Sequence, residues 1–168
     1  MIAYRSATAA DIAAIDSLFR RSFADTFAHL YDPADLAAFF ARFTEAAWRE
    51  ELLDPDYAFR LAEEEDGMLA GFAKVSSTTV AGLEEPAAEL RQLYVLEPWQ
   101  GTGVARALIE WAFAEGRRRG AAALYLTVFT DNHRARRFYE RYGFEAVGHH
   151  AFMVGNQADD DIVMRAEL

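Results

Sequence analysis

Residues 100–105 read QGTGVA, and this short loop decides which fold the rest of the chain supports. Its two glycines are ambiguous by themselves, because glycine also supplies the left-handed backbone angles of an ordinary structural turn. The flanking pattern is more specific: the strand-like segment ELRQLYVLE precedes the loop, and an amphipathic helix pattern begins at Val104. A glycine-rich loop that leads into a helix presents unpaired amide groups and the positive end of the helix dipole to one point. This context favours a phosphate-binding loop over a plain turn.

Two well-known nucleotide-binding loops are excluded by the neighbouring residues. The dinucleotide-binding fingerprint requires a third glycine at position 106, where this chain has Arg106. The P-loop requires a Gly-Lys-Ser/Thr ending, which is also missing. If this loop binds a phosphate, it therefore does so as a motif other than these two.

The remaining segments alternate between helix and strand patterns. Thr8, the Asp32-Pro33 pair and Thr44 each mark a helix start, and the Asp66-Gly67 pair predicts the tight turn of a hairpin. This order predicts the α/β fold class, with a mixed central β-sheet flanked by helices on both faces, in a single domain over residues 1–168. Strands are expected over 2–5, 57–66, 68–80, 89–97, 123–129, 144–155 and 161–168, and the later helices over 104–119 and from 133 to the glycine at 143.

Composition limits the function classes. The chain has 168 residues, 52% of them hydrophobic, yet no apolar run approaches the ~20 residues of a membrane span. The N-terminal sequence lacks a secretory-signal pattern, so a soluble, cytoplasmic protein is expected. The chain has no cysteine, which excludes disulfides, thiolate metal sites and an acyl-thioester on the protein itself. No metal is expected.

The charge balance points away from nucleic acid and membrane partners. The 17 Lys and Arg against 27 Asp and Glu give a net charge of −10, which repels polyanions and attracts cations. Two acidic clusters, residues 63–66 and 159–161, are expected to be solvated turns. An anionic ligand must therefore be held by local groups.

The loop and a second motif resemble those of the GNAT family of N-acetyltransferases. The family's pyrophosphate loop has the pattern Gln/Arg-x-x-Gly-x-Gly/Ala, and its second motif is Asn-x-x-Ala-x-x-x-Tyr followed by Gly-Phe. The resemblance covers essentially the whole chain and implies the GNAT fold, acetyl-CoA-dependent N-acetyltransferase activity and a small-molecule amine acceptor. The matching positions are Gln100, Gly103, Ala105, Asn132, Ala135, Tyr139, Gly143 and Phe144.

The resemblance also implies the contacts of coenzyme A. Backbone groups of Leu93, Tyr94 and Val95 would hold its pantetheine arm, in a segment that is also simply a buried strand pattern. Asn132 would be a further cofactor contact or only a helix cap. The pyrophosphate would lie against Gln100, Gly101, Thr102, Gly103, Val104, Ala105 and Arg106.

An amine acceptor must lose a proton before it reacts. With an amine pKa of ~10.4, reaching the free base near neutral pH costs about 4 kcal/mol, so a proton acceptor is useful. Tyr139 is the candidate proton donor to the leaving thiolate, with a core aromatic residue as the alternative, and an amide of residues 93–95 would stabilise the oxyanion. Some relatives carry a glutamate as base where this chain has Thr127. Glu89 is the next candidate, against a solvated surface glutamate, and His150 is a weaker one.

Within the family, the chain most resembles bacterial spermidine/spermine N-acetyltransferases. The likeness lies in FADTF at 23–27, ELRQLYV at 89–95, and HAFMVG at 150–155 followed by DIVM at 161–164. It implies a polyamine acceptor, for which Asp25, in the first interhelical segment, and Glu89, on the central strand, are the candidate contacts. The alternatives are acetylation of a protein N-terminus or another small amine, a non-catalytic acyl-CoA sensor, and a globular domain with neither site. The oligomeric state stays open between monomer and homodimer.

Overall fold

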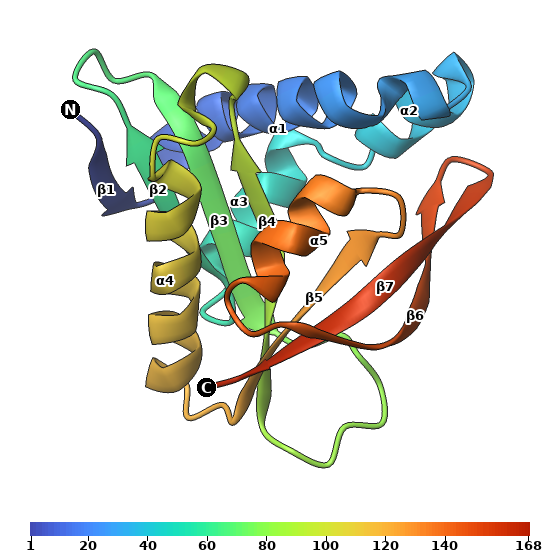
Figure 1. The fold of residues 1–168 in the computed structure, drawn as a ribbon. Helices are drawn as coiled ribbons and strands as arrows, with labels where there is room; N and C mark the ends of the chain where they lie inside the picture. Colours follow the sequence, from blue (N-terminus) through green and yellow to red (C-terminus); the bar gives the residue numbers. More distant parts are fainter.

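The computed structural model describes residues 1–168 and contains one seven-stranded sheet with the strand order β1-β2-β3-β4-β5-β7-β6 (Figure 1). The β4–β5 pair is parallel and every other neighbouring pair is antiparallel. The predicted mixed sheet is thereby confirmed. The strands are β1 Ala3–Ser6, β2 Ala58–Glu63, β3 Leu69–Ser77, β4 Ala87–Val95, β5 Ala123–Phe129, β6 Glu145–Val154 and β7 Gln157–Glu167; the helices are α1 Ile12–Phe27, α2 Pro33–Phe40, α3 Glu45–Leu53, α4 Val104–Arg118 and α5 His133–Glu140.

Helices cover both faces of the sheet, as the sequence predicts. Helices α4 and α5 lie in front of the sheet in Figure 1, and α1 to α3 lie behind it. The front face buries Leu108 and Ile109 of α4, and the rear face buries Phe19 of α1 and Trp48 of α3. The sheet therefore separates two apolar clusters. No helix combines the length and the apolar character that crossing a lipid bilayer requires.

The expected helix starts are present at the N-terminal half of the chain. Thr8 and Asp11 form a capping box ahead of α1. The Asp32 carboxylate accepts a hydrogen bond from the amide of Ala34 at 2.9 Å, and the Thr44 hydroxyl caps α3 in the same way. Helix α1 continues to Phe27, so Asp25 lies within its last turn and not between helices, where the sequence pattern had suggested it.

The prediction of an acidic turn at residues 159–161 is wrong. The turn between β6 and β7 lies at residues 155–156, and β7 begins at Gln157, so the three aspartates belong to a strand. Asp159 and Asp161 point to the same face and are only 8% and 6% exposed. A strand alternates its side chains between two faces, so Asp159 and Asp161 share one face. Asp161 pairs with both β5 and β6, whereas Asp159 pairs with β6 alone.

The sheet opens between its two parallel strands. β4 and β5 pair only from Ala87 opposite Ala123 to Glu89 opposite Tyr125, and beyond this point they have no shared register. A bulge in the β3–β4 pairing, between Lys74 and Val75, bends β4 at the same level. Helix α5 lies in front of the separated strands in Figure 1. The fold therefore leaves an unpaired strand edge inside the molecule.

Candidate active site

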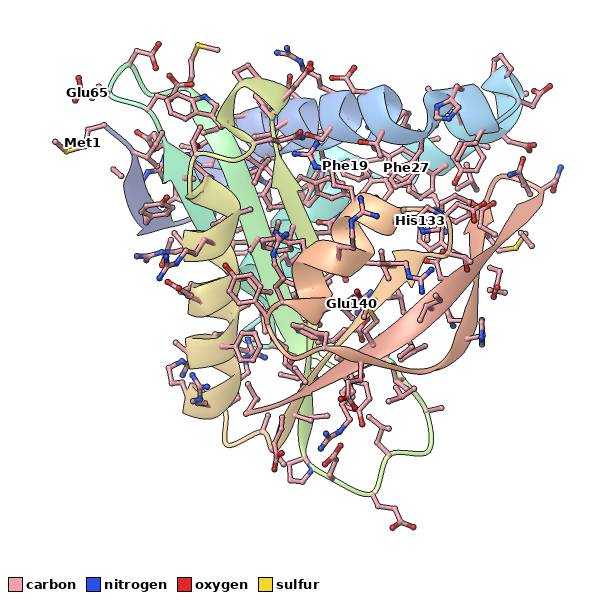
Figure 2. All side chains as sticks on the ribbon, in the orientation of Figure 1. Met1, Phe19, Phe27, Glu65, His133 and Glu140 are labelled. Atoms are coloured by element: carbon pink, nitrogen blue, oxygen red, sulfur yellow. The ribbon has the colours of Figure 1, made fainter.

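A cleft of about 260 Å³ occupies the place where β4 and β5 separate. Its walls come from α1, the end of β4, β5, α5 and the β6–β7 hairpin. Phe27 at the end of α1, labelled in Figure 2, closes one side by packing its ring against that of Phe129 on β5 at 6.1 Å. The lining includes these positions predicted from the sequence: Asp25, Leu93, Tyr94, Val95, Gln100, Thr127, Asn132, Ala135 and Tyr139.

The unpaired edge of β4 turns main-chain groups toward the cleft. The amide of Leu96 donates to the carbonyl of Ala70 on β3 at 2.9 Å. Because the hydrogen-bonding direction alternates along an antiparallel strand, the main-chain groups of Leu93 and Val95 face away from β3. The Val95 carbonyl accepts a hydrogen bond from the Gln100 side chain at 3.1 Å. This leaves the Leu93 main chain on the open edge, where an extended ligand can add as a further strand.

The loop after β4 exposes amide groups at the start of α4. Gly101 and Gly103 adopt φ of 78° and 98°, values that favour glycine, and a Cβ at either position would meet no atom within 4 Å. Gly103 caps α4 without any side-chain bond, and the amides of residues 103–106 donate to no acceptor in the chain. The Arg106 guanidinium instead pairs with Glu110 at 2.8 Å on the exposed helix surface. The loop thus fits a phosphate through its main chain.

Helix α5 contributes Asn132 and Tyr139. The Asn132 side chain accepts a hydrogen bond from the amide of Ala135 at 3.2 Å, so the helix-cap interpretation is confirmed for this residue. Tyr139 packs its ring 5.7 Å from that of Phe144, and burial raises the pKa of its hydroxyl to about 12. Tyr139 is therefore both a packed aromatic residue and a protonated phenol on the cleft wall.

Neither predicted general base lies on the cleft wall. Glu89 is buried, with 5% exposure, and its carboxylate accepts hydrogen bonds from the amide and hydroxyl of Thr79 at 2.7 and 3.0 Å. At this position β4 still pairs with β5, so no opening exists beside it. The interpretation of Glu89 as a solvated surface residue is therefore wrong, and its role as the base stays a prediction. His150 is exposed on β6 and also lies outside the cleft lining.

Two carboxylates that line the cleft were missed in the sequence. Asp159 accepts a hydrogen bond from the hydroxyl of Tyr31 and another from the Gln157 amide at 3.0 Å. Burial, with a smaller contribution from Asp159 and Asp160, raises the pKa of Asp161 to about 7. Burial, with help from the Asp159 bond, also raises the pKa of Tyr31. The one available signal was the two-residue spacing of Asp159 and Asp161 directly before the apolar strand pattern IVM.

Asp25 stands at the mouth of the cleft. Its side chain is 64% exposed and lies 3.8 Å from the Arg21 guanidinium, one helical turn earlier. This exposed pair is weak because water screens it. The structure thus brings Asp25 to the same cleft as Asp159 and Asp161, in a far more solvated position.

Comparisons with known proteins agree with this geometry. The sequence profile described as the acetyltransferase (GNAT) family matches residues 14–144. An uncharacterized N-acetyltransferase of Mycobacterium tuberculosis is 35% identical over 137 residues, which make up 81% of this chain and 84% of the relative. The crystal structure of the PaiA N-acetyltransferase from Thermoplasma acidophilum in complex with coenzyme A superposes with a TM-score of 0.79, at 20% identity, over 100% of this chain and 99% of that one. The ribosomal-protein-S18-alanine N-acetyltransferase of Escherichia coli does so with a TM-score of 0.72, at 22% identity, over 99% and 94%. At these identities the two superpositions concern the fold.

Proposed function

This chain belongs to the GNAT family of acetyltransferases, and from that premise we propose that its cleft moves an acetyl group from acetyl-CoA directly to a polycationic primary amine such as spermidine or spermine. One observation carries the proposal: the open edge of β4 and two buried carboxylates line a single cleft, and the loop with free amides follows directly after β4. We call residues 93–95, 100–106 and Tyr139 the donor end. The acceptor end consists of Ser22, Asp25, Gln92, Asp159 and Asp161.

At the donor end, main-chain groups bind the acetyl donor. The free amides of residues 103–106 would hold the pyrophosphate, aided by the dipole of α4. The open edge of β4 at Leu93 would pair with the amides of the pantetheine arm. The cleft volume of about 260 Å³ suits the reacting ends of both substrates and not the whole of coenzyme A, so the nucleotide would lie outside it. When bound, acetyl-CoA supplies an acetyl group activated as a thioester.

Tyr139 is proposed to hold the proton that the departing sulfur needs. A phenol with a pKa of about 12 stays protonated at neutral pH and can donate its proton from Oη. The main-chain amide of Leu93 is proposed to stabilise negative charge on the carbonyl oxygen during transfer. The chain has no cysteine, which agrees with transfer that does not pass through an enzyme thioester.

The proposed acceptor class follows from charge. The net charge of −10 attracts cations over a distance, and three carboxylates line the acceptor end of the cleft. A polyamine carries several positive charges, so one can react while another pairs with Asp25 at the mouth. Asp25 thereby remains the proposed contact for the distal charge.

The test is a panel of amines incubated with acetyl-CoA, with release of free coenzyme A as the signal. The panel contains spermidine, spermine, a monoamine of similar length and a peptide with a free N-terminal alanine. The proposal expects the highest kcat/KM for the polyamines. Absence of turnover with every amine, together with intact binding of acetyl-CoA, would instead support an acyl-CoA sensor.

The second candidate acceptor is a protein N-terminus. It is favoured by the fold likeness to an enzyme named for the alanine of a ribosomal protein. A peptide N-terminus carries one ammonium group close to a polar backbone, so it needs fewer carboxylates than a polyamine. Turnover of the alanine peptide without turnover of spermidine would replace the polyamine assignment and leave the acetyltransferase assignment intact.

A further inference from the structure

The acceptor end contains buried polar atoms without partners. Ser22 Oγ on α1 and Gln92 Oε1 on β4 are enclosed and form no hydrogen bond within the chain. Both residues line the cleft. Buried polar groups in folded proteins are nearly always paired, because an unpaired one loses its hydration without compensation. Two residues with such atoms in the wall of one cleft therefore indicate a ligand that completes their hydrogen bonding.

Asp161 extends this group of unpaired acceptors. Asp161 is only 6% exposed, so it is more than nine-tenths buried, and it lines the same cleft. Only burial and the neighbouring carboxylates act on it; no hydrogen-bond donor and no cation does. Asp160, the next residue, points outward and pairs with His149 at 3.0 Å. The unpaired charge is thus specific to the side of β7 that faces the cleft.

The three partners define the chemistry of the missing ligand. A carboxylate and an amide oxygen only accept hydrogen bonds, and the serine hydroxyl can accept as well as donate. The complementary group must carry several N–H donors and a positive charge. A primary ammonium group meets both conditions, whereas a carboxylate or phosphate would be repelled.

We propose that Asp161 binds the ammonium group of the acceptor and takes up its proton, with Ser22 and Gln92 as further hydrogen-bond acceptors for the same group. This inference rests on the proposed amine-acetylating function and adds the residue that activates the amine. In the step, one N–H bond of the ammonium breaks and its electron pair stays on nitrogen. An O–H bond forms on the Asp161 carboxylate, which later returns the proton to water at the cleft mouth.

The surroundings of Asp161 suit this exchange. A pKa of about 7 lets the carboxylate bind a proton and release it near neutral pH. Tyr31 donates its hydroxyl to Asp159, the neighbouring carboxylate on the same face of β7. The titratable groups around Asp161 are Asp159 and Asp160 on β7, Tyr31 after α1, Tyr94 on β4, and His150 opposite it on β6.

The experiment compares Asp161→Asn with Asp160→Asn, which removes the same charge from the outward side of the same strand. For Asp161→Asn we expect kcat/KM for spermidine to fall by about 10²-fold, with loss of the rise in rate through pH ~7, while calorimetry gives an unchanged Kd for acetyl-CoA. For Asp160→Asn we expect less than about a twofold change, as for an ordinary surface residue. Wild-type kcat/KM and an unaltered pH profile in Asp161→Asn would overturn the inference.

A second variant keeps the inference testable if Asp161→Asn folds poorly. Ser22→Ala removes a hydroxyl that bonds nothing in the chain, so its thermal midpoint should stay at or above that of the wild type. Its KM for spermidine should rise by roughly threefold to tenfold, the loss of one hydrogen bond to a charged group. An unchanged KM would contradict the proposed contact. If the wild-type protein turns over no amine, the proposed function is wrong as well. If Asp161→Asn keeps the wild-type kcat/KM, this inference alone is wrong.

Discussion

The donor end and the acceptor end of the cleft are built by different means. The donor end uses main-chain groups from one continuous segment, the end of β4 and the loop into α4, plus Tyr139. The acceptor end uses side chains that come from α1 near the start of the chain, from Gln92 on β4 and from β7 near the end of the chain. The donor end consists mainly of a sheet edge and a helix terminus. The acceptor end exists only when distant segments of the chain pack together.

This difference explains why the donor is easier to assign than the acceptor. Main-chain ligands depend on backbone shape, so the glycines and the helix start are the only positions that mark them in a sequence. A side-chain site can change with each substitution and carries no local motif. Chains with the same fold can therefore share a donor and differ in the amine that they modify.

The largest loss of activity from a change at the donor end is expected for Tyr139→Phe. The change keeps the packed ring and removes the proton donor, so kcat should fall by about 10²-fold with little change in the affinity for acetyl-CoA. Assays of coenzyme A release measure kcat, and calorimetry measures the affinity for acetyl-CoA. Tyr142→Phe is the matched control, because Tyr142 packs on Phe138 nearby and does not line the cleft. Equal activity of both variants would reduce Tyr139 to a core residue.

The donor loop is tested by Gly103→Val. The new side chain occupies open space in front of the free amides and strains a backbone with φ of 98°, so the Kd for acetyl-CoA should rise by roughly tenfold or more. Gly67→Val is the control for strain alone, since Gly67 has φ of 86°, has no neighbouring atom within 4 Å and lies in the β2–β3 turn. Similar binding in both variants would remove the loop from the donor site.

The acceptor end should lower the stability of the fold. The pKa of Asp161 is raised to about 7, so folding favours its protonated form. This contribution is fully present below the unfolded pKa of ~3.9 and is lost as the pH rises through ~7. Asp161→Asn should therefore be more stable than the wild type by up to about 4 kcal/mol at pH ~8, and the difference should vanish below pH ~4. Urea titrations at the two pH values measure it, and a variant of lower stability at the higher pH would contradict the sign.

The smallest effect is expected at the cleft mouth. Asp25→Asn should raise KM for spermidine by about threefold at low salt, because an exposed carboxylate contributes little. Added salt should erase the difference, since the Debye length falls to ~8 Å at physiological ionic strength. Glu65→Gln is the control: Glu65 lies beside Met1, well away from the cleft-wall residue Phe27 in Figure 2, and carries the same charge. An equal rise in KM in both variants would contradict a specific contact at Asp25, because the net charge alone would then explain the effect.

The sequence predicted the local structure of the donor end, because the signals for it are local. The helix start at Val104, the glycines before it and the Asn132 cap each depend on a few neighbouring residues. Glu89 was misplaced because the strand pattern does not reveal where β4 and β5 stop pairing, and that point decides which residues reach the cleft.

Asp159 and Asp161 were misjudged for a related reason. A run of three aspartates normally remains in water, and only its incorporation into strand β7 of the sheet turns two of them inward. Strand register is a property of the assembled sheet, so it could not be predicted from the acidic run alone. The unpaired oxygens of Ser22 and Gln92 likewise became visible only in the packed structure.

The central claim is direct transfer of an acetyl group to an amine in this cleft. Its most direct test is incubation of the wild-type protein with acetyl-CoA that is isotopically labelled in the acetyl group and with spermidine, followed by mass spectrometry of the amine and of the intact protein. We expect label on a nitrogen of the amine, dependent on the protein, and none on the protein itself. Label that remains covalently on the protein, or that reaches no amine of the panel, would contradict it.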